Sequence, residues 1–136
     1  MAHLLDANLL IALFDNAHTH HARVRRWFIA TSGSFATCPI VEGALVRWIV
    51  RIVGAAGAEL AAVELRKLAA DPRHRFWPDD LGYEDVRWEG VLGHRQVTDA
   101  YLAALARKHR GRLATLDKGL AALHNDIADL ISLDAD

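Results

Sequence analysis

Apolar residues in this chain form short runs that alternate with longer stretches in which they recur every three or four positions. Short runs predict strands, and the helical spacing predicts amphipathic helices. The predicted strands are residues 2–5, 35–37, 75–77, 112–116 and 130–133. The predicted helices are residues 8–14, 18–30, 39–52, 58–70, 83–91, 99–108 and 119–123. This alternation favours the α/β class, with a parallel sheet covered by helices on both faces.

The helix predicted from Pro39 carries one broad apolar stripe along its length. The residues of this stripe are Val41, Leu45, Trp48, Ile49 and Ile52. Leu45 and Ile49 are expected to pack on the sheet. The stripe is wide enough that Trp48, Ile52 and Val53 could remain exposed on its other side. There they could form a groove for a partner helix or a second subunit.

Length and composition favour one globular domain spanning residues 1–136. The chain has 136 residues, of which 52% are hydrophobic, which excludes a disordered chain. No apolar run approaches the roughly 18 residues that a membrane span needs, and the first residues lack the basic region of a signal peptide. We therefore expect a cytoplasmic protein with no membrane association. The single cysteine, Cys38, excludes an intramolecular disulfide framework and a cysteine-type zinc cluster.

Four acidic residues stand at or near predicted helix starts. Asp6 follows the first strand, Glu42 lies in the first turn after Pro39, Asp99 opens the helix at 99–108, and Asp117 stands where the strand at 112–116 ends. Each position has a purely structural explanation. A helix N-cap is worth about 1 kcal/mol, and a first-turn acid gains roughly 0.3–1 kcal/mol from the helix dipole.

The joint placement of these acids also predicts a site. Strand-to-helix junctions of a parallel sheet share its carboxyl edge, so the four side chains are expected to converge on one crevice. Adjacent carboxylates repel one another, and a hard divalent cation such as Mg²⁺ would offset that repulsion. Such a cation can lower the pKa of a bound water and stabilise charge at phosphorus. The net charge of the whole chain is −1, so the rest of the chain carries +3 once these four acids are set aside. A mildly basic surface around an acidic site suits a phosphate-backbone substrate.

Two small polar residues lie close to these acids in the sequence. Asn8 follows Asp6 by two positions, and Thr115 precedes Asp117 by two, on the same face of a strand. Either side chain could hydrogen-bond a carboxylate or a water on the metal. Polar residues that simply end a strand are an equally good interpretation.

Four segments of the chain together resemble the PIN-domain ribonucleases, and most closely the VapC-type toxins of bacterial toxin–antitoxin pairs. These segments are LLDAN, PIVEGALVR, VTDAYLAALA and LATLD. The resemblance implies a PIN-like three-layer sandwich with a short parallel sheet of about five strands, and cleavage of RNA that depends on Mg²⁺ or Mn²⁺. It also implies a homodimer and a cognate antitoxin that blocks the site. The residues that match the family's acids and polar partners are Asp6, Glu42, Asp99, Asp117, Asn8 and Thr115.

An RNA substrate would need basic residues near the acids to contact its backbone. The candidates close to the predicted site in sequence are Arg47, Arg51, Lys108, Arg110, Arg112 and Lys118.

Two other functions fit the same acids. One is an aspartate-based phosphotransfer or dehalogenase-type hydrolase with Asp6 as nucleophile. That chemistry needs a lysine beside a second acid, and Lys118, placed after Asp117, suits it poorly. The other is a degenerate, non-catalytic binding module, against which the four intact acids argue.

Overall fold

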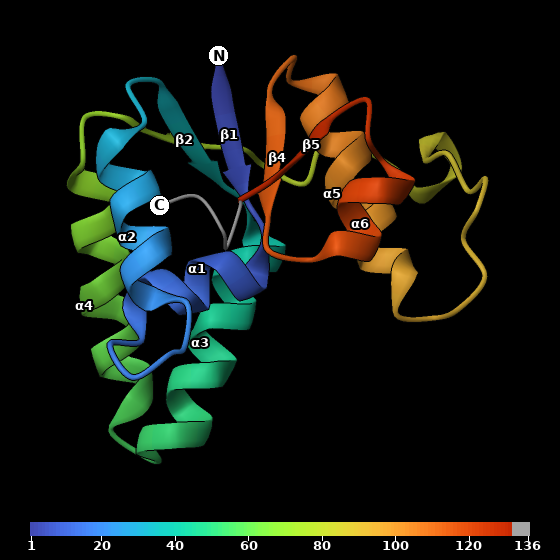
Figure 1. Cartoon of the computed structure of the whole chain (residues 1–136). Helices are drawn as coiled ribbons and strands as arrows, with labels where there is room; N and C mark the ends of the chain where they lie inside the picture. The colour runs from blue at the N-terminus through green and yellow to red at the C-terminus, as the bar shows by residue number, and fades with distance from the viewer. Residues whose placement is uncertain (132–136) are drawn as a thin grey trace.

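The computed structural model describes residues 1–131, which form a five-stranded sheet in the order β3-β2-β1-β4-β5 (Figure 1). The strands are β1 (Ala2–Leu5), β2 (Ser34–Thr37), β3 (His74–Phe76), β4 (Arg112–Thr115) and β5 (Ala128–Leu130). All neighbouring strands run parallel, and Leu4 of β1 is in register with Ala36 on one side and Leu113 on the other. The predicted α/β class and the parallel five-stranded sheet are confirmed.

The helices lie on opposite faces of this sheet, as Figure 1 shows. One face carries α1 (Ala7–Phe14), α2 (His21–Ala30), α3 (Pro39–Val53) and α4 (Gly57–Ala70), and the other carries α5 (Gln96–Lys108) and α6 (Lys118–Leu123). This division follows from right-handed crossovers, because the chain moves outward from β1 to β3 and then in the opposite direction from β4 to β5. The strand order therefore reverses between β1 and β4, which is where α/β sheets bind ligands.

The core is centred on the two middle strands and on α5. Leu5 of β1 and Leu113 of β4 are fully buried, and α5 is buried on every side from Ala100 to Ala106. Alanine at four of those seven helix positions allows close packing between the sheet and the 77–95 loop. None of the helices within residues 1–131 has the length and apolar character needed to cross a bilayer.

The predicted helix at 83–91 is wrong, because the structure has only a short 3-10 turn at Tyr83–Asp85. Val86 is the sole buried residue of this stretch, so no apolar stripe exists to hold a helix against the core. Gly90 also interrupts the stretch with a φ of 80°, and a Cβ there would come within 2.4 Å of Leu123. The segment is therefore an irregular loop that leads from β3 into α5.

Several other boundaries also differ from those predicted, among them those of the second helix and the last strand. The second helix begins at His21 rather than at 18, because the preceding residues form a turn in which the His20 amide donates to His18 Nδ1 at 3.0 Å. The last strand is Ala128–Leu130 instead of 130–133, since the register pairs Leu113 of β4 with Ala128. Residues 132 and 133 of that prediction lie outside the described residues.

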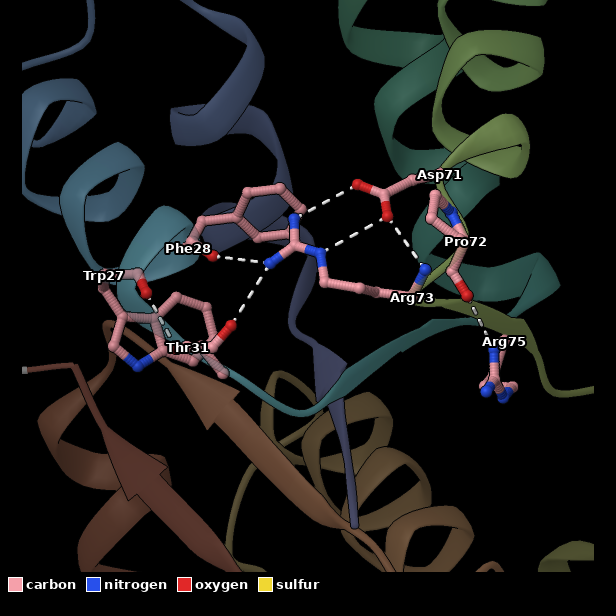
Figure 2. A network of polar contacts seen from close by, with 7 residues as sticks. All are labelled: Trp27, Phe28, Thr31, Asp71, Pro72, Arg73 and Arg75. Carbon is pink, nitrogen blue, oxygen red and sulfur yellow. Dashed lines mark hydrogen bonds and ion pairs between the residues drawn. The ribbon is translucent and has the colours of Figure 1, made fainter.

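A polar network around Arg73 connects α2 to the start of β3 (Figure 2). The guanidinium donates to the Asp71 carboxylate through Nε at 3.3 Å and through Nη2 at 3.1 Å. Its Nη1 donates to the carbonyls of Phe28 and Thr31, at 2.9 and 3.3 Å. These carbonyls end α2 and have no partner within the helix, so Arg73 supplies the donors they need. The network fixes the chain one residue before β3 begins.

Candidate active site

Asp6 lies between β1 and α1 and is only 6% exposed. It caps α1, because its Oδ1 accepts the Ala7 amide at 2.8 Å. Its Oδ2 accepts the hydroxyl proton of the fully buried Thr115 at 2.8 Å. Burial raises the pKa of Asp6, the hydrogen bonds from Thr115 and Ala7 lower it, and the charge of Asp117 raises it further, with a net upward shift.

Asp117 caps α6 in the same way, and its Oδ1 accepts the Leu120 amide at 3.0 Å. Its own amide donates to Thr115 Oγ1 at 3.0 Å. Thr115, the last residue of β4, therefore connects the backbone of one acid to the carboxylate of the other. This contact joins β4 to β1 at the point where the strand order reverses.

Asp99 completes a group of three acids at this edge of the sheet. It lies in the first turn of α5, which begins at Gln96 and not at Asp99 as predicted. Burial, followed by the negative charges of Asp6 and Asp117, raises the pKa of Asp99 to about 6. The structure thus brings Asp6, Asp99 and Asp117 within electrostatic reach of one another.

Glu42 lies one strand away from this group, in the first turn of α3, which follows β2. Its Oε2 accepts the hydroxyl proton of Thr37 at 2.6 Å, and Thr37 Oγ1 also contacts His74 Nε2 at 2.7 Å. Burial raises the pKa of Cys38 to about 11, with smaller upward contributions from the nearby Asp79 and Glu42 charges. Because β2 pairs with β1, the fourth acid lies at the same edge of the sheet as Asp6, one strand away.

The two predicted polar partners differ in the structure. Thr115 binds Asp6 and Asp117, as described above. Asn8 is exposed on α1, and within residues 1–131 its side chain makes no hydrogen bond to Asp6. Sequence reasoning missed Thr37 and His74. The signal for Thr37 was present, because strands β2 and β4 both end in the pair Ala-Thr.

Three of the predicted RNA-contacting residues lie at the wrong edge of the sheet. Lys108, Arg110 and Arg112 come at or before the start of β4, whereas the acids lie beyond its end. Arg112 pairs with Asp129 at 2.8 Å, and Lys108 lies 3.7 Å from an Asp80 carboxylate oxygen. Lys118, directly after Asp117, is exposed at the same edge as the acids.

The donors at this edge suit a hard cation. They are carboxylate oxygens, and within residues 1–131 none of Asp6, Asp99 and Asp117 forms an ion pair with a basic side chain. Oxygen donors with uncompensated negative charge are what Mg²⁺ and Mn²⁺ prefer. In the same part of the chain, no three His, Cys, Asp or Glu side chains already stand in a metal-holding arrangement.

A second feature is a groove between α1, α2, α3 and α4, with a volume of about 480 Å³. Its apolar part is lined by Leu13, Phe14, Trp48, Ile52 and Leu60, and its polar part includes His21, Arg25 and Glu64. Ile52 is 64% exposed, and Trp48 is half-buried. The exposed side predicted for the α3 stripe is therefore present, and its inner side is buried as expected.

Comparisons with known proteins agree with this geometry. The family model for the PIN domain matches residues 3–125 of this chain. The ribonuclease VapC29 of Mycobacterium tuberculosis is 53% identical over 131 residues, which cover 96% of this chain and 97% of that protein.

Solved structures share the fold, and two of them have a TM-score above 0.6. VapC20 of M. tuberculosis, a sarcin–ricin loop cleaving toxin, has a TM-score of 0.67 at 20% identity over 90% of this chain and 95% of that one. A toxin–antitoxin complex from Klebsiella pneumoniae has a TM-score of 0.61 at 22% identity over 88% and 90%. The chain belongs to the PIN-domain family and, within it, to the VapC ribonucleases.

Proposed function

We propose that residues 1–136 form a single nuclease domain that hydrolyses RNA phosphodiester bonds with Mg²⁺, or Mn²⁺ in its place, as the toxin of a toxin–antitoxin pair. PIN-domain ribonucleases typically use a divalent metal. The observation that carries the proposal is the convergence of Asp6, Asp99 and Asp117 at the edge of the sheet where the strand order reverses. Burial and the charges of the other two acids there raise the pKa of Asp99 to about 6. A cluster of like charges at a strand-order switch point is costly in a purely structural role. We also place this activity in the cytoplasm, which holds cellular RNA.

Each acid has a part in this proposal. Asp6, Glu42 and Asp99 would hold the cation directly or through water, and Asp117 would hold a second ion or orient a water. When bound, the cation supplies Lewis-acid chemistry at the phosphate. Thr115 supports Asp6 by donating its hydroxyl proton to Oδ2. The two cap contacts further fix the carboxylates of Asp6 and Asp117 at the sheet edge.

The proposal includes two protein partners. The groove beside Trp48 and Ile52 would take a helix of a cognate antitoxin, because an amphipathic helix can bury its apolar face against Trp48 and Ile52 and place polar residues beside Arg25 and Glu64. The solved neighbour from K. pneumoniae is itself a toxin–antitoxin complex, which supports an antitoxin as a partner. A homodimer is the proposed assembly of the toxin.

The phosphotransfer alternative has little support. In Asp6, both carboxylate oxygens already accept hydrogen bonds, and the side chain is buried, which leaves a poor nucleophile. The match to VapC29 over nearly the full length likewise favours the ribonuclease over a degenerate binding module.

The test is cleavage of end-labelled total RNA by the purified protein, with Mg²⁺ or with EDTA. We expect discrete cuts that EDTA abolishes and that Asp6→Asn and Asp99→Asn lack. Glu59→Gln is the matched control, because Glu59 is an exposed acid on α4 and its variant should cleave normally. Cleavage that persists in EDTA or in both aspartate variants would overturn the proposal.

A further inference from the structure

Strands β2 and β4 end in the same local arrangement. Each ends in Ala-Thr, and both threonines, Thr37 and Thr115, are fully buried. Each hydroxyl lies against a carboxylate of the proposed site. Thr115 donates to Asp6 at 2.8 Å, and Thr37 donates to Glu42 at 2.6 Å. The two acids are thus supported by equivalent residues on different strands.

The second contact of each hydroxyl differs between the two strands. A hydroxyl has one proton, so an oxygen that gives this proton to a carboxylate must accept from its other partner. Thr115 accepts from the Asp117 backbone amide at 3.0 Å. Thr37 lies 2.7 Å from His74 Nε2, which must therefore be the donor. At β2, a side chain takes the role that the backbone has at β4.

We propose that His74 is a positioning residue for Glu42, acting through Thr37. In this relay, His74 Nε2–H donates to Thr37 Oγ1, whose own proton goes to Glu42 Oε2, and Glu42 Oε1 is left for the cation. The inference rests on the proposed function, in which Glu42 holds a metal. Groups that orient a metal ligand in this way are worth roughly 10- to 100-fold in metal affinity.

The position of His74 is itself well fixed. It is the first residue of β3 and is in register with Phe35, whose ring centroid lies 5.3 Å from that of the imidazole. The preceding residue, Arg73, is held by the polar network in Figure 2. Burial lowers the pKa of His74, against the smaller upward effects of the Glu42 and Asp71 charges. A neutral imidazole has one ring proton, and the relay requires this proton on Nε2.

The first test is Mn²⁺ affinity, measured by isothermal titration calorimetry on the purified protein. His74→Leu removes the donor, and Thr37→Val removes the relaying hydroxyl. We expect each to weaken Mn²⁺ binding by about 10-fold or more. The double variant should bind no more weakly than Thr37→Val alone, because His74 acts only through Thr37. His74→Gln retains an N–H donor and should restore most of the affinity. Losses that multiply in the double variant would overturn the relay.

Two further measurements separate this inference from the proposed function. If Glu42→Gln loses Mn²⁺ binding but His74→Leu binds like the wild type, the metal site stands and the relay is wrong. If Glu42→Gln binds Mn²⁺ normally, Glu42 is no ligand and the inference falls with that part of the proposal. Nitrogen-15 NMR of the metal-free protein provides a readout that needs no activity. We expect the Nε2–H tautomer of His74, and the Nδ1–H tautomer would refute the relay.

Discussion

Replacing Asp99 with asparagine should stabilise the metal-free protein while abolishing RNA cleavage. Burial and the charges of Asp6 and Asp117 raise the pKa of Asp99 from 3.8 to about 6. At 1.36 kcal/mol per pKa unit, this difference costs the ionised, folded protein about 3 kcal/mol. Asparagine has the same size without the charge, but it loses roughly 0.3–1 kcal/mol of favourable interaction with the α5 dipole. The expected net gain in the free energy of unfolding at pH 7 is therefore about 2 kcal/mol.

The same pKa fixes how this gain depends on pH. A carboxyl group with a raised pKa in the folded state binds its proton more tightly there than in the unfolded state. The contribution of Asp99 to stability is therefore unfavourable above about pH 6 and becomes less so as the pH falls toward 4. Below about pH 4 both states carry the proton, and the stability difference between wild type and Asp99→Asn should nearly vanish.

The assay is urea unfolding in EDTA, at pH 7 and at pH 4. Asp71→Asn is the matched control, because the hydrogen bonds from Arg73 lower the pKa of Asp71, and its replacement should destabilise the protein at pH 7. Saturating Mn²⁺ should stabilise the wild type and leave Asp99→Asn nearly unchanged, since a ligand stabilises only the state that binds it. An Asp99→Asn protein that is no more stable than wild type at pH 7, or whose gain persists at pH 4, would refute the reasoning.

Three other substitutions test separate parts of the structure. Thr115→Val removes the donor to Asp6 and leaves the Asp117 amide unpaired. We therefore expect a loss of about 1–3 kcal/mol in the free energy of unfolding by urea, and weaker Mn²⁺ binding by calorimetry. Unchanged values would contradict the contacts described. Trp48→Ala should weaken binding of the cognate antitoxin by about 10-fold or more, because large aromatic side chains in such grooves often dominate the binding energy. Its effect on Tm should be smaller. An unaltered affinity would show that the antitoxin docks at another surface. Arg73→Met leaves the carbonyls that end α2 without their donor and should lower the free energy of unfolding by about 2 kcal/mol in urea. An unchanged urea midpoint would show that the network in Figure 2 adds no stability.

The sheet was predictable from the sequence because its strands are short apolar runs between helices of clear periodicity. The run at 2–5 was placed correctly, and the strand at 112–116 was placed to within one residue. The 77–95 loop was not predictable in the same way. Its two buried side chains, Trp77 and Val86, lie nine residues apart and give no period. The path of the loop depends on distant contacts, such as that from Tyr101 Oη to the Leu81 carbonyl at 3.0 Å.

The candidate site divides along similar lines. Asp6 and Asp117 were identifiable because a strand-to-helix junction is a local pattern of a few residues. Their grouping with Asp99 followed from the general geometry of parallel sheets. The support of Glu42 could not be predicted, because the contact between Thr37 and His74 spans 37 residues and depends on the register of β2 with β3.

The structural interpretation of Asp6 and Asp117 as helix caps is correct, and it is compatible with the proposed metal site because capping uses only part of each carboxylate. Oδ1 of Asp6 accepts the Ala7 amide, and Oδ1 of Asp117 accepts the Leu120 amide. An ionised carboxylate has about four acceptor sites, so the caps leave acceptor positions for a cation. The caps also offset part of the repulsion, since each contributes about 1 kcal/mol to its helix. Asp99 accepts no such cap bond within the described residues, and burial together with the neighbouring charges raises its pKa to about 6. The helix starts therefore hold two carboxylates beside a third that only a proton or a cation can neutralise.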